Sequence, residues 1–326
     1  MNIMKNYKEQ QKNKQILLIQ DSDIFDFDSA NGMFMGKKRE FVLQDGKNNL
    51  YSPIREDCIS YFKNNKISWW GGSSPSGHVL SSQIACLNHL FLIRHDKEAV
   101  LSIINGIRDC FIDVLPIPTD KEEATYISFE VVSYEDHLNE KQVTRGSNCT
   151  SIDAFVYARH KNGQLILLPI EWKYTESYQT CDKSTEDRPG EPQGTNSKGL
   201  ERLRRYSNLI ETSHQLKSLR EYAGSVYFQE PFYQLMRQTL WAEQMILNNV
   251  TEPIKGDDFL HIHIVPNENV ELLKREYRVS SKNMEDTWKN LLTDTSKYVL
   301  VSPEQLLNPI YETYPKLIQY LKTRYW

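Results

Sequence analysis

The sequence predicts an α/β protein in which a central mixed β-sheet is flanked by α-helices, with further helical elaborations at both ends of the chain. Three observations favour this class. Two neighbouring segments, residues 151–157 and 167–174, alternate like the strands of one hairpin. A β-branched and aromatic run at residues 259–265, closed by Pro266, predicts another strand. Amphipathic helical patterns precede and separate these segments, at residues 78–94, 198–222 and 230–245.

The first elements of the core follow a loop at residues 66–77. Ser76 or His78 is placed to begin the helix that comes next. Trp69 and Trp70, beside glycines in the loop, either stack on a nucleic-acid base or, as is more common, fill an edge of the core. After that helix, residues 126–132 alternate as the first strand of the sheet.

The turn of the hairpin decides which strand residues face each other. A two-residue Asn-Gly turn would place Asp153 opposite Trp172, whereas a three-residue loop at residues 161–163 would place it opposite Glu171. A shift of one residue moves every side chain to the other face of the sheet. Only the three-residue loop collects the apolar side chains on one face. We therefore predict that Asp153 and Glu171 are cross-strand neighbours.

The two faces of this hairpin differ in polarity. The apolar face, which is expected to pack on the core, carries Ile152, Ala154, Val156, Ile166, Leu168, Ile170, Trp172 and Tyr174. The opposite face carries Asp153, Glu171 and Lys173 at one end and Phe155, Tyr157, Leu165 and Leu167 at the other. Burying an unpaired charge is costly. Either the three charged residues form an ion-pair cluster on a solvated face, or they build a site.

A metal site explains the charges best. Two carboxylates ~4 Å apart repel by about 4 kcal/mol at an effective dielectric of ~20. A divalent cation converts that repulsion into attraction, and oxygen ligands suit Mg²⁺ or Mn²⁺. Lys173, on the same face, is placed to orient or deprotonate an attacking water or to stabilise a transition state. These groups together predict phosphodiester hydrolysis.

The order and spacing of these residues resemble a known motif. Ile152-Asp153, followed after a hairpin by Glu171-Trp172-Lys173, is similar to the motif of the PD-(D/E)XK nuclease superfamily, and most of all to bacterial restriction-endonuclease-like proteins. Ile152 replaces the proline, at a position that varies in the superfamily. The resemblance implies a restriction-endonuclease-like core in which a helix, three meandering strands, a second helix and a fourth strand follow one another.

The resemblance also implies an activity. It implies a Mg²⁺- or Mn²⁺-dependent deoxyribonuclease whose substrate is DNA. Asp153 and Glu171 would hold the metal with the carbonyl oxygen of Trp172, and Lys173 would be the catalytic lysine. Many relatives cut both strands as homodimers. A structure- or end-specific repair nuclease, or a catalytically silent member that binds DNA or a protein, is the alternative.

Supporting residues are placed by the same resemblance. Many relatives carry a metal-binding glutamate on the first helix, where this chain has Gln83. Glu130, a lone acid in the first strand, is a further ligand or, more commonly, a strand-edge charge. Some exonuclease relatives carry a Gln-X-X-X-Tyr helix near the metal, and Gln234-X-X-X-Gln238 matches only its first residue.

Basic residues for phosphate contacts are predicted on the two helices after the hairpin. They are Arg202 and Arg205 near the start of one and Arg237 in the other. A solvated helix face balanced by acids explains the first two equally well. The polar segment 176–198 is rich in helix breakers, and such long loops are uncommon unless functional. We expect it to be a mobile loop on the substrate side.

Length and composition set the outer limits. With 326 residues and a net charge of −4, the chain can bury a large core but is not a basic nucleic-acid binder overall. We expect an N-terminal elaboration at residues 1–65, a nuclease-like core at residues 66–267 and a helical C-terminal extension at residues 268–326. No apolar run is long enough to cross a membrane, and the five scattered cysteines fit a reduced cytoplasmic compartment.

Overall fold

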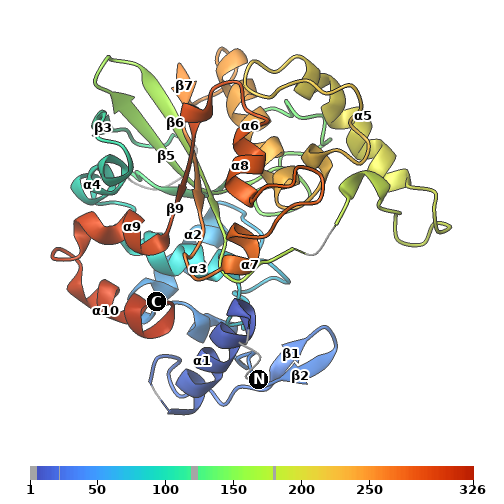
Figure 1. Cartoon of the computed structure of the whole chain (residues 1–326). Coiled ribbons are helices and arrows are strands. Elements are labelled where there is room, and N and C mark those ends of the chain that lie inside the picture. The colour runs from blue at the N-terminus through green and yellow to red at the C-terminus, as the bar shows by residue number, and fades with distance from the viewer. Residues whose placement is uncertain (1–5, 22, 119–123, 179–180) are drawn as a thin grey trace.

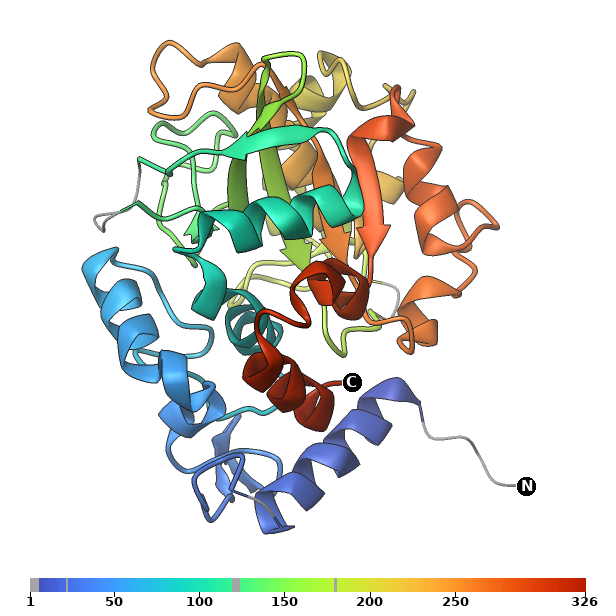
Figure 2. The same ribbon diagram turned by 90° about the vertical axis from the view of Figure 1, so that its left-hand side faces the viewer.

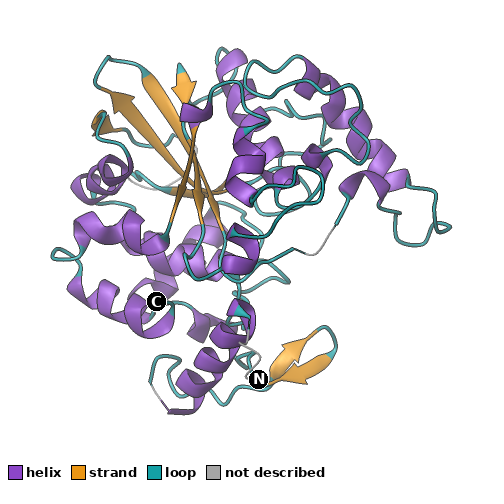
Figure 3. Cartoon of the chain, viewed as in Figure 1, coloured by secondary structure: helices purple, strands orange, loops and turns teal. Residues whose placement is uncertain are grey.

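The central sheet is mixed and lies between two layers of helices (Figure 1, Figure 3). The computed structural model describes residues 6–21, 23–118, 124–178 and 181–326. In that part of the chain the sheet has seven strands: β3 (Phe111–Val114), β4 (Ser128–Val131), β5 (Ile152–His160), β6 (Leu165–Trp172), β7 (Asp258–Phe259), β8 (His261–Ile264) and β9 (Tyr298–Val301). The predicted fold class is confirmed.

The β5–β6 hairpin organises the sheet. β5 pairs antiparallel with β3, β4 and β6, whereas β6 runs parallel to β7 and β8, and β8 runs parallel to β9. β5 and β6 are therefore inner strands that are covered on both faces. This position explains why β6 reads almost entirely apolar and why its charges need partners.

The predicted register of the hairpin is confirmed. Ala154 pairs with Ile170 and Arg159 with Leu165, so the next position places Asp153 opposite Glu171. The turn closes through a hydrogen bond of 2.9 Å from the N–H of His160 to the carbonyl of Gln164. Gly163 adopts a φ of 93°, which is the left-handed conformation that a three-residue loop requires.

Helices cover both faces of the sheet. One layer contains α2 (Arg55–Asn64), α3 (Ser82–Leu90), α4 (Lys97–Ile107), α9 (Pro303–Leu307) and α10 (Pro315–Arg324), and Figure 2 shows α4 lying across the sheet. The other contains α5 (Ser197–Glu211), α6 (Phe232–Leu247) and α8 (Met284–Lys289). As predicted, Leu168, Ile170 and Trp172 pack in the first layer's core. Ile152 is an exception, because it packs in the core beneath α6.

The two ends of the chain pack together beside the first layer. Near the N-terminus, α1 (Tyr7–Asp21) precedes a small separate hairpin, β1 (Gly32–Phe34) and β2 (Lys37–Arg39). Arg324 of α10 is fully buried and donates to the carbonyl of Asn49 at 2.6 Å. Gln15 of α1 donates back to the carbonyl of Arg324 at 2.6 Å. This buried network joins segments that are about 300 positions apart.

Most predicted elements lie within a few residues of their expected bounds, but two helices differ. The helix predicted from residue 78 begins at Ser82, because the hydroxyl of Ser81, not Ser76 or His78, accepts the N–H of Ile84 and caps it. The helix predicted to reach residue 222 ends at Glu211. There Glu243 of α6 accepts the main-chain N–H groups of the following residues, which draws the chain out of the helix.

The C-terminal part is not the purely helical extension that was expected. It contains α7 (Val270–Leu273), α8, α9 and α10, but residues 298–301 form β9. Val299 pairs with Ile262 and Val301 with Ile264, so this run completes the sheet beside β8. Its apolar, β-branched character suits a strand better than a helix turn. No helix of the described residues is long and apolar enough to cross a membrane.

Candidate active site

The charged end of the β5–β6 hairpin brings Asp153, Glu171 and Lys173 together. Asp153 is half-buried, whereas Glu171 and Lys173 are 2% and 5% exposed. The main-chain N–H of Trp172 donates to Oδ2 of Asp153 at 2.8 Å, across the strand pair. The neighbouring strand thus holds the Asp153 carboxylate in position beside Glu171.

Glu171 and Lys173 form a buried ion pair that α6 completes. The Lys173 ammonium contacts Oε1 of Glu171 and also donates to Oε1 of Gln234 at 2.5 Å. The second oxygen of Glu171 accepts from the amide of Gln238. Gln234 and Gln238 lie one turn apart on α6, so they share a helix face. Both charged side chains are therefore fixed by a rigid helix on one side and by the sheet on the other.

A histidine of β8 orients the Gln238 amide. Burial lowers the pKa of His261 to about 3, so its imidazole is neutral. Its Nε2–H donates to Oε1 of Gln238 at 2.8 Å, and its Nδ1 accepts from the hydroxyl of Thr239 at 3.3 Å. With its oxygen engaged by His261, the Gln238 amide presents its N–H to Glu171. A chain of hydrogen bonds thus runs from β8 to the candidate site.

Glu130 of β4 approaches the same place in an unusual conformation. It lies between Phe129 and Val131, which pair with β5 on either side of Asp153. Its φ is 51°, in the left-handed region that residues with a Cβ rarely adopt, and such strain is concentrated at functional sites. Gln83 of α3 donates to its Oε1 at 2.6 Å. Gln83 therefore supports an acid here and does not replace one.

The electrostatics of the site reflect an excess of buried negative charge. Burial, and then the nearby Glu171 carboxylate, raises the pKa of Asp153 well above its usual value. Burial also raises the pKa of Glu130. For Lys173 burial alone would lower the pKa, but the attraction of Glu171 outweighs it and the pKa lies well above its usual range. Lys173 is therefore a stable ammonium group.

The three acids line one open cavity of about 330 Å³. Glu130, Asp153 and Glu171 form part of its wall, and α6 contributes Gln234, Arg237 and Gln238. Lys183, from the segment 176–198, also borders the cavity. Residues 179–180 of that segment lie outside the described residues. Figure 1 shows this segment and α5 projecting from the body on one side of the sheet. The acids are thus accessible to a ligand despite their burial.

The arginines predicted to contact phosphate are engaged by acids. Arg202 lines the cavity and donates to Glu186 at 2.6 Å. Arg237 also lines it and lies 3.2 Å from Oε1 of Glu140. Arg205 lies in a neighbouring hollow instead, bound to Glu201 at 2.6 Å within α5. Only two of the three arginines therefore face the candidate site.

The donor set fits a hard cation held by few protein ligands. Among the described residues no group of three or more His, Cys, Asp and Glu side chains is arranged to hold a metal ion. Mg²⁺, however, is commonly bound through one or two carboxylates and completes its shell with water and substrate phosphates. Burial, and then the charge of Glu171, raises the pKa of Asp153, so the protein alone does not fully stabilise its ionised form. Asp153 and Glu171 suit such a two-carboxylate site.

The sequence related Gln234 and Gln238 to the site only through a partial match to the Gln-X-X-X-Tyr helix, and it gave Glu230 no role. Gln234 and Gln238 each bind a charged residue of the site, and Glu230 lines the cavity beside them. The helix pattern places residues 234 and 238 on one face, and that was the available signal. Nothing in the sequence shows that this face meets β6. Lys183 is a similar case, because only the folded loop brings it to the cavity.

Comparison with known proteins adds one finding. A family model described as Restriction Endonuclease associating with ARP matches residues 13–326. The match includes the β5–β6 hairpin, α6 and every residue of the cavity, so the candidate site lies wholly within it. No curated protein and no solved structure matches the chain.

Proposed function

The chain belongs to the family described as Restriction Endonuclease associating with ARP, and on that basis we propose that it is a metal-dependent nuclease that hydrolyses phosphodiester bonds of DNA. One observation carries this proposal. Asp153, Glu171 and Lys173 occur in the order and spacing of a PD-(D/E)XK site; Asp153 and Glu171 line an open cavity from inner strands, and Lys173, just past the end of β6, is paired with Glu171. A purely structural Glu171–Lys173 ion pair would not need Asp153, a second acid whose pKa is raised, beside it.

In this proposal Asp153 and Glu171 hold Mg²⁺ or Mn²⁺ together with the carbonyl oxygen of Trp172. When bound, the ion supplies a water of lowered pKa and neutralises charge that develops on the phosphate. Gln238 keeps Glu171 oriented toward the cavity, because its own amide is held by His261. Trp172 keeps Asp153 in place through its main-chain N–H.

Lys173 acts as a cation in this proposal and not as a base. A lysine with a raised pKa keeps its proton at neutral pH, so it cannot deprotonate a water. Its ammonium group can instead donate to a phosphate oxygen and stabilise charge in the transition state. Gln234 fixes the position of that ammonium group. Of the roles predicted from the sequence, the raised pKa opposes deprotonation of the water and is consistent with orienting the water or stabilising the transition state.

Arg202 and Arg237 are the basic groups we assign to substrate phosphates, because both line the cavity. Each would exchange its acid, Glu186 or Glu140, for a phosphate oxygen. A guanidinium binds phosphate in the same two-pronged geometry as a carboxylate, so the exchange keeps its hydrogen bonds. Arg205 would contact DNA only beyond the cavity.

The test is cleavage of methylated and unmethylated plasmid, linear duplex and single-stranded DNA with and without Mg²⁺ or Mn²⁺. We expect metal-dependent cutting by the wild type and a loss of about 10²-fold or more in Lys173→Ala and Asp153→Asn. Lys161→Ala, in the exposed turn of the same hairpin, is the matched control and should cut normally. The product pattern separates an endonuclease from a structure- or end-specific nuclease.

Two outcomes count against the proposal. Cutting that survives both substitutions places the reaction at a different centre. Absence of cutting from every substrate favours the alternative, a silent member of the fold that binds DNA or a protein. One observation favours that alternative, because both oxygens of Glu171 already have protein partners. Calorimetric titration of the metal-free protein with MgCl₂ distinguishes a silent site from an active nuclease whose substrate was not tested. A silent site of this kind would bind no Mg²⁺ and release no heat.

A further inference from the structure

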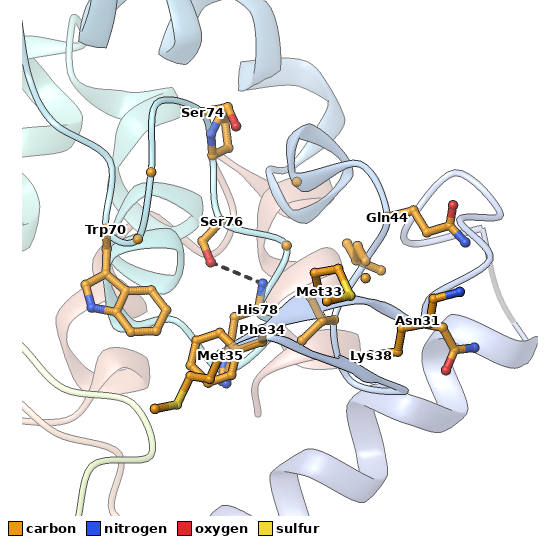
Figure 4. Close-up of a pocket in the computed structure, with 18 residues that line it drawn as sticks. Asn31, Met33, Phe34, Met35, Lys38, Gln44, Trp70, Ser74, Ser76 and His78 are labelled. Atoms are coloured by element: carbon orange, nitrogen blue, oxygen red, sulfur yellow. Dashed lines mark hydrogen bonds between the residues drawn. The ribbon is translucent and has the colours of Figure 1, made fainter.

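A second solvent-facing hollow lies outside the candidate active site, between the β1–β2 hairpin and residues 70–78. It has a volume of about 720 Å³. We use the name hairpin surface for one part of its wall together with the adjoining Lys37; it consists of Met33, Phe34, Met35, Lys37, Lys38, Trp70 and His78. Figure 4 shows the side chains of Phe34, Met35, Trp70 and His78 gathered on one side of it. Lys37 adjoins this group at the start of β2.

The hairpin surface exposes large apolar side chains in a fixed arrangement. Met33 is 62%, Met35 83% and Trp70 47% exposed. The Phe34 ring lies 4.6 Å from His78 and 5.8 Å from Trp70 between centroids, so the rings support one another. Trp69 behaves differently, because it is buried and stacks on Phe62 at 3.8 Å. Of the two tryptophans in this loop, one fills the core and the other faces solvent.

The hairpin itself is held firmly at its base. The N–H of Gly32 donates to the carbonyl of Val42 at 2.8 Å. Gly32 also lies so close to the main chain of Leu43 that a Cβ would not fit there. Met35 and Gly36 both have left-handed φ angles, of 50° and 73°, as a tight hairpin turn with a primed geometry requires. The exposed side chains are thus presented on a short ribbon that is anchored at its base.

The charge of this surface is positive and unpaired. Lys37 and Lys38 are exposed, and in the described part of the chain neither side chain has an ion pair or a hydrogen bond. Arg202, Arg205 and Arg237, by contrast, are all bound to acids. The two lysines are therefore available to a polyanion without first losing a partner. His78 adds no charge, because burial lowers its pKa to about 4.

Two hydrogen bonds connect the hairpin surface to the candidate active site. The main-chain N–H of Trp70 donates to Oε1 of Gln83 at 2.9 Å. Gln83 in turn donates to Oε1 of Glu130, which lines the catalytic cavity. Trp70 is thus close enough for one DNA molecule to contact both places. Figure 1 shows the β1–β2 hairpin projecting from the body on the same side as α5.

We propose that the hairpin surface is a second DNA contact, in which Lys37 and Lys38 bind backbone phosphates while Trp70, Phe34 and Met35 pack against bases beside the cut. Exposed aromatic rings stack on bases of any identity, and Met and Phe side chains insert between base steps. Aromatic and Met side chains are common at protein interfaces too, but lysine is depleted there, so the two unpaired lysines are the feature that favours DNA. The proposal rests on the proposed nuclease function and extends it.

The experiment measures binding apart from cutting. A fluorescein-labelled duplex of random sequence is titrated with the full-length protein in EDTA, at several KCl concentrations, and anisotropy gives the Kd. We expect Lys37→Ala/Lys38→Ala to bind on the order of 10-fold more weakly and to lower the slope of log K against log salt by about 2. Trp70→Ala should bind on the order of 10-fold more weakly with an unchanged slope.

The matched control is Lys282→Ala/Lys316→Ala, which removes two exposed lysines from other elements and should bind like the wild type. Far-UV circular dichroism checks that each variant is folded. If Lys37→Ala/Lys38→Ala binds DNA with the wild-type Kd and salt slope, the inference is wrong while the proposed function stands. The same holds if that variant keeps its DNA binding but loses a protein partner. A wild type that neither binds nor cuts DNA overturns the inference together with the proposed function.

Discussion

Two hairpins of this protein, β5–β6 and β1–β2, share a design but place their charges in opposite settings. Both turn through a glycine in the left-handed conformation, Gly163 in one and Gly36 in the other. The β5–β6 hairpin lies inside a seven-stranded sheet, and Glu171 and Lys173 are buried and bonded to each other and to α6. The β1–β2 hairpin forms a two-stranded sheet of its own, and its lysines face solvent.

The difference shows how burial separates two kinds of function. A charge in the interior needs a partner, so the groups of β5–β6 are held in one arrangement that suits chemistry. An exposed charge is stable without a partner, so the groups of β1–β2 remain available for binding. Substitutions in the first hairpin should therefore change stability and reaction together. Substitutions in the second should change binding alone.

The largest expected effect is on the buried ion pair. Glu171→Gln leaves the Lys173 ammonium buried without its counter-charge, so the free energy of unfolding should fall by about 3–5 kcal/mol. Lys37→Ala/Lys38→Ala should change it by less than about 0.5 kcal/mol, because both side chains are exposed. Urea denaturation followed by circular dichroism measures both.

A double substitution tests whether the loss of stability in Glu171→Gln comes from the broken ion pair with Lys173. Glu171→Gln/Lys173→Met removes both charges, so it should be less destabilised than the sum of its two single variants. An unchanged urea midpoint in Glu171→Gln would show that Lys173 is compensated elsewhere. It would also remove the contrast between the two hairpins.

An intermediate effect is expected at Asp153. Its pKa is raised by burial and by Glu171, so the folded protein binds this proton more tightly than the unfolded chain does. Between pH 3.8 and the raised pKa, Asp153 is ionised in the unfolded chain but still protonated in the folded protein. The free energy of unfolding therefore falls as the pH rises through this range. In EDTA, Asp153→Asn should have a higher Tm than the wild type, by a margin that widens as the pH rises above 3.8 and stops widening above the raised pKa.

Metal ions should reverse the order of the Tm values of Asp153→Asn and the wild type. At pH 8, MgCl₂ should raise the Tm of the wild type, since a ligand that binds only the folded state stabilises it, and should leave Asp153→Asn unchanged. Asp109→Asn, an exposed aspartate beyond the other end of the hairpin, serves as the control and should follow the wild type. Equal responses of Asp153→Asn and the wild type to MgCl₂ would exclude Asp153 as a ligand.

The smallest effect is expected at the two turns. Gly163→Ala and Gly36→Ala each add a side chain in open space at a positive φ, so each strains its turn by about 1 kcal/mol. For Gly163 the strain should lower the global free energy of unfolding. For Gly36 it should reduce only the hydrogen-exchange protection of β1 and β2, because this small sheet can open by itself. A shift of the global transition in Gly36→Ala would contradict this separation.

The local sequence pattern was sufficient to predict the β5–β6 hairpin and the face that carries its three charged residues. Nine- and eight-residue strands carry enough alternation to define a face, and a slip of one residue would have buried the wrong side. The β1–β2 hairpin, with strands of three residues, is too short for that signal, and it was not predicted. Residues 298–301 were assigned to a helical region because a short apolar run has no clear period.

Chain order and periodicity alone thus established the α/β class, the register of the central hairpin and the meeting of Asp153 with Glu171, because these depend on neighbours close in sequence. Long-range packing alone established the partners of those charges. Gln234 and Gln238 reach Lys173 and Glu171 across more than 60 positions. The pairing of the arginines with acids and the exposure of Lys37 and Trp70 likewise follow from tertiary burial, which no local pattern encodes.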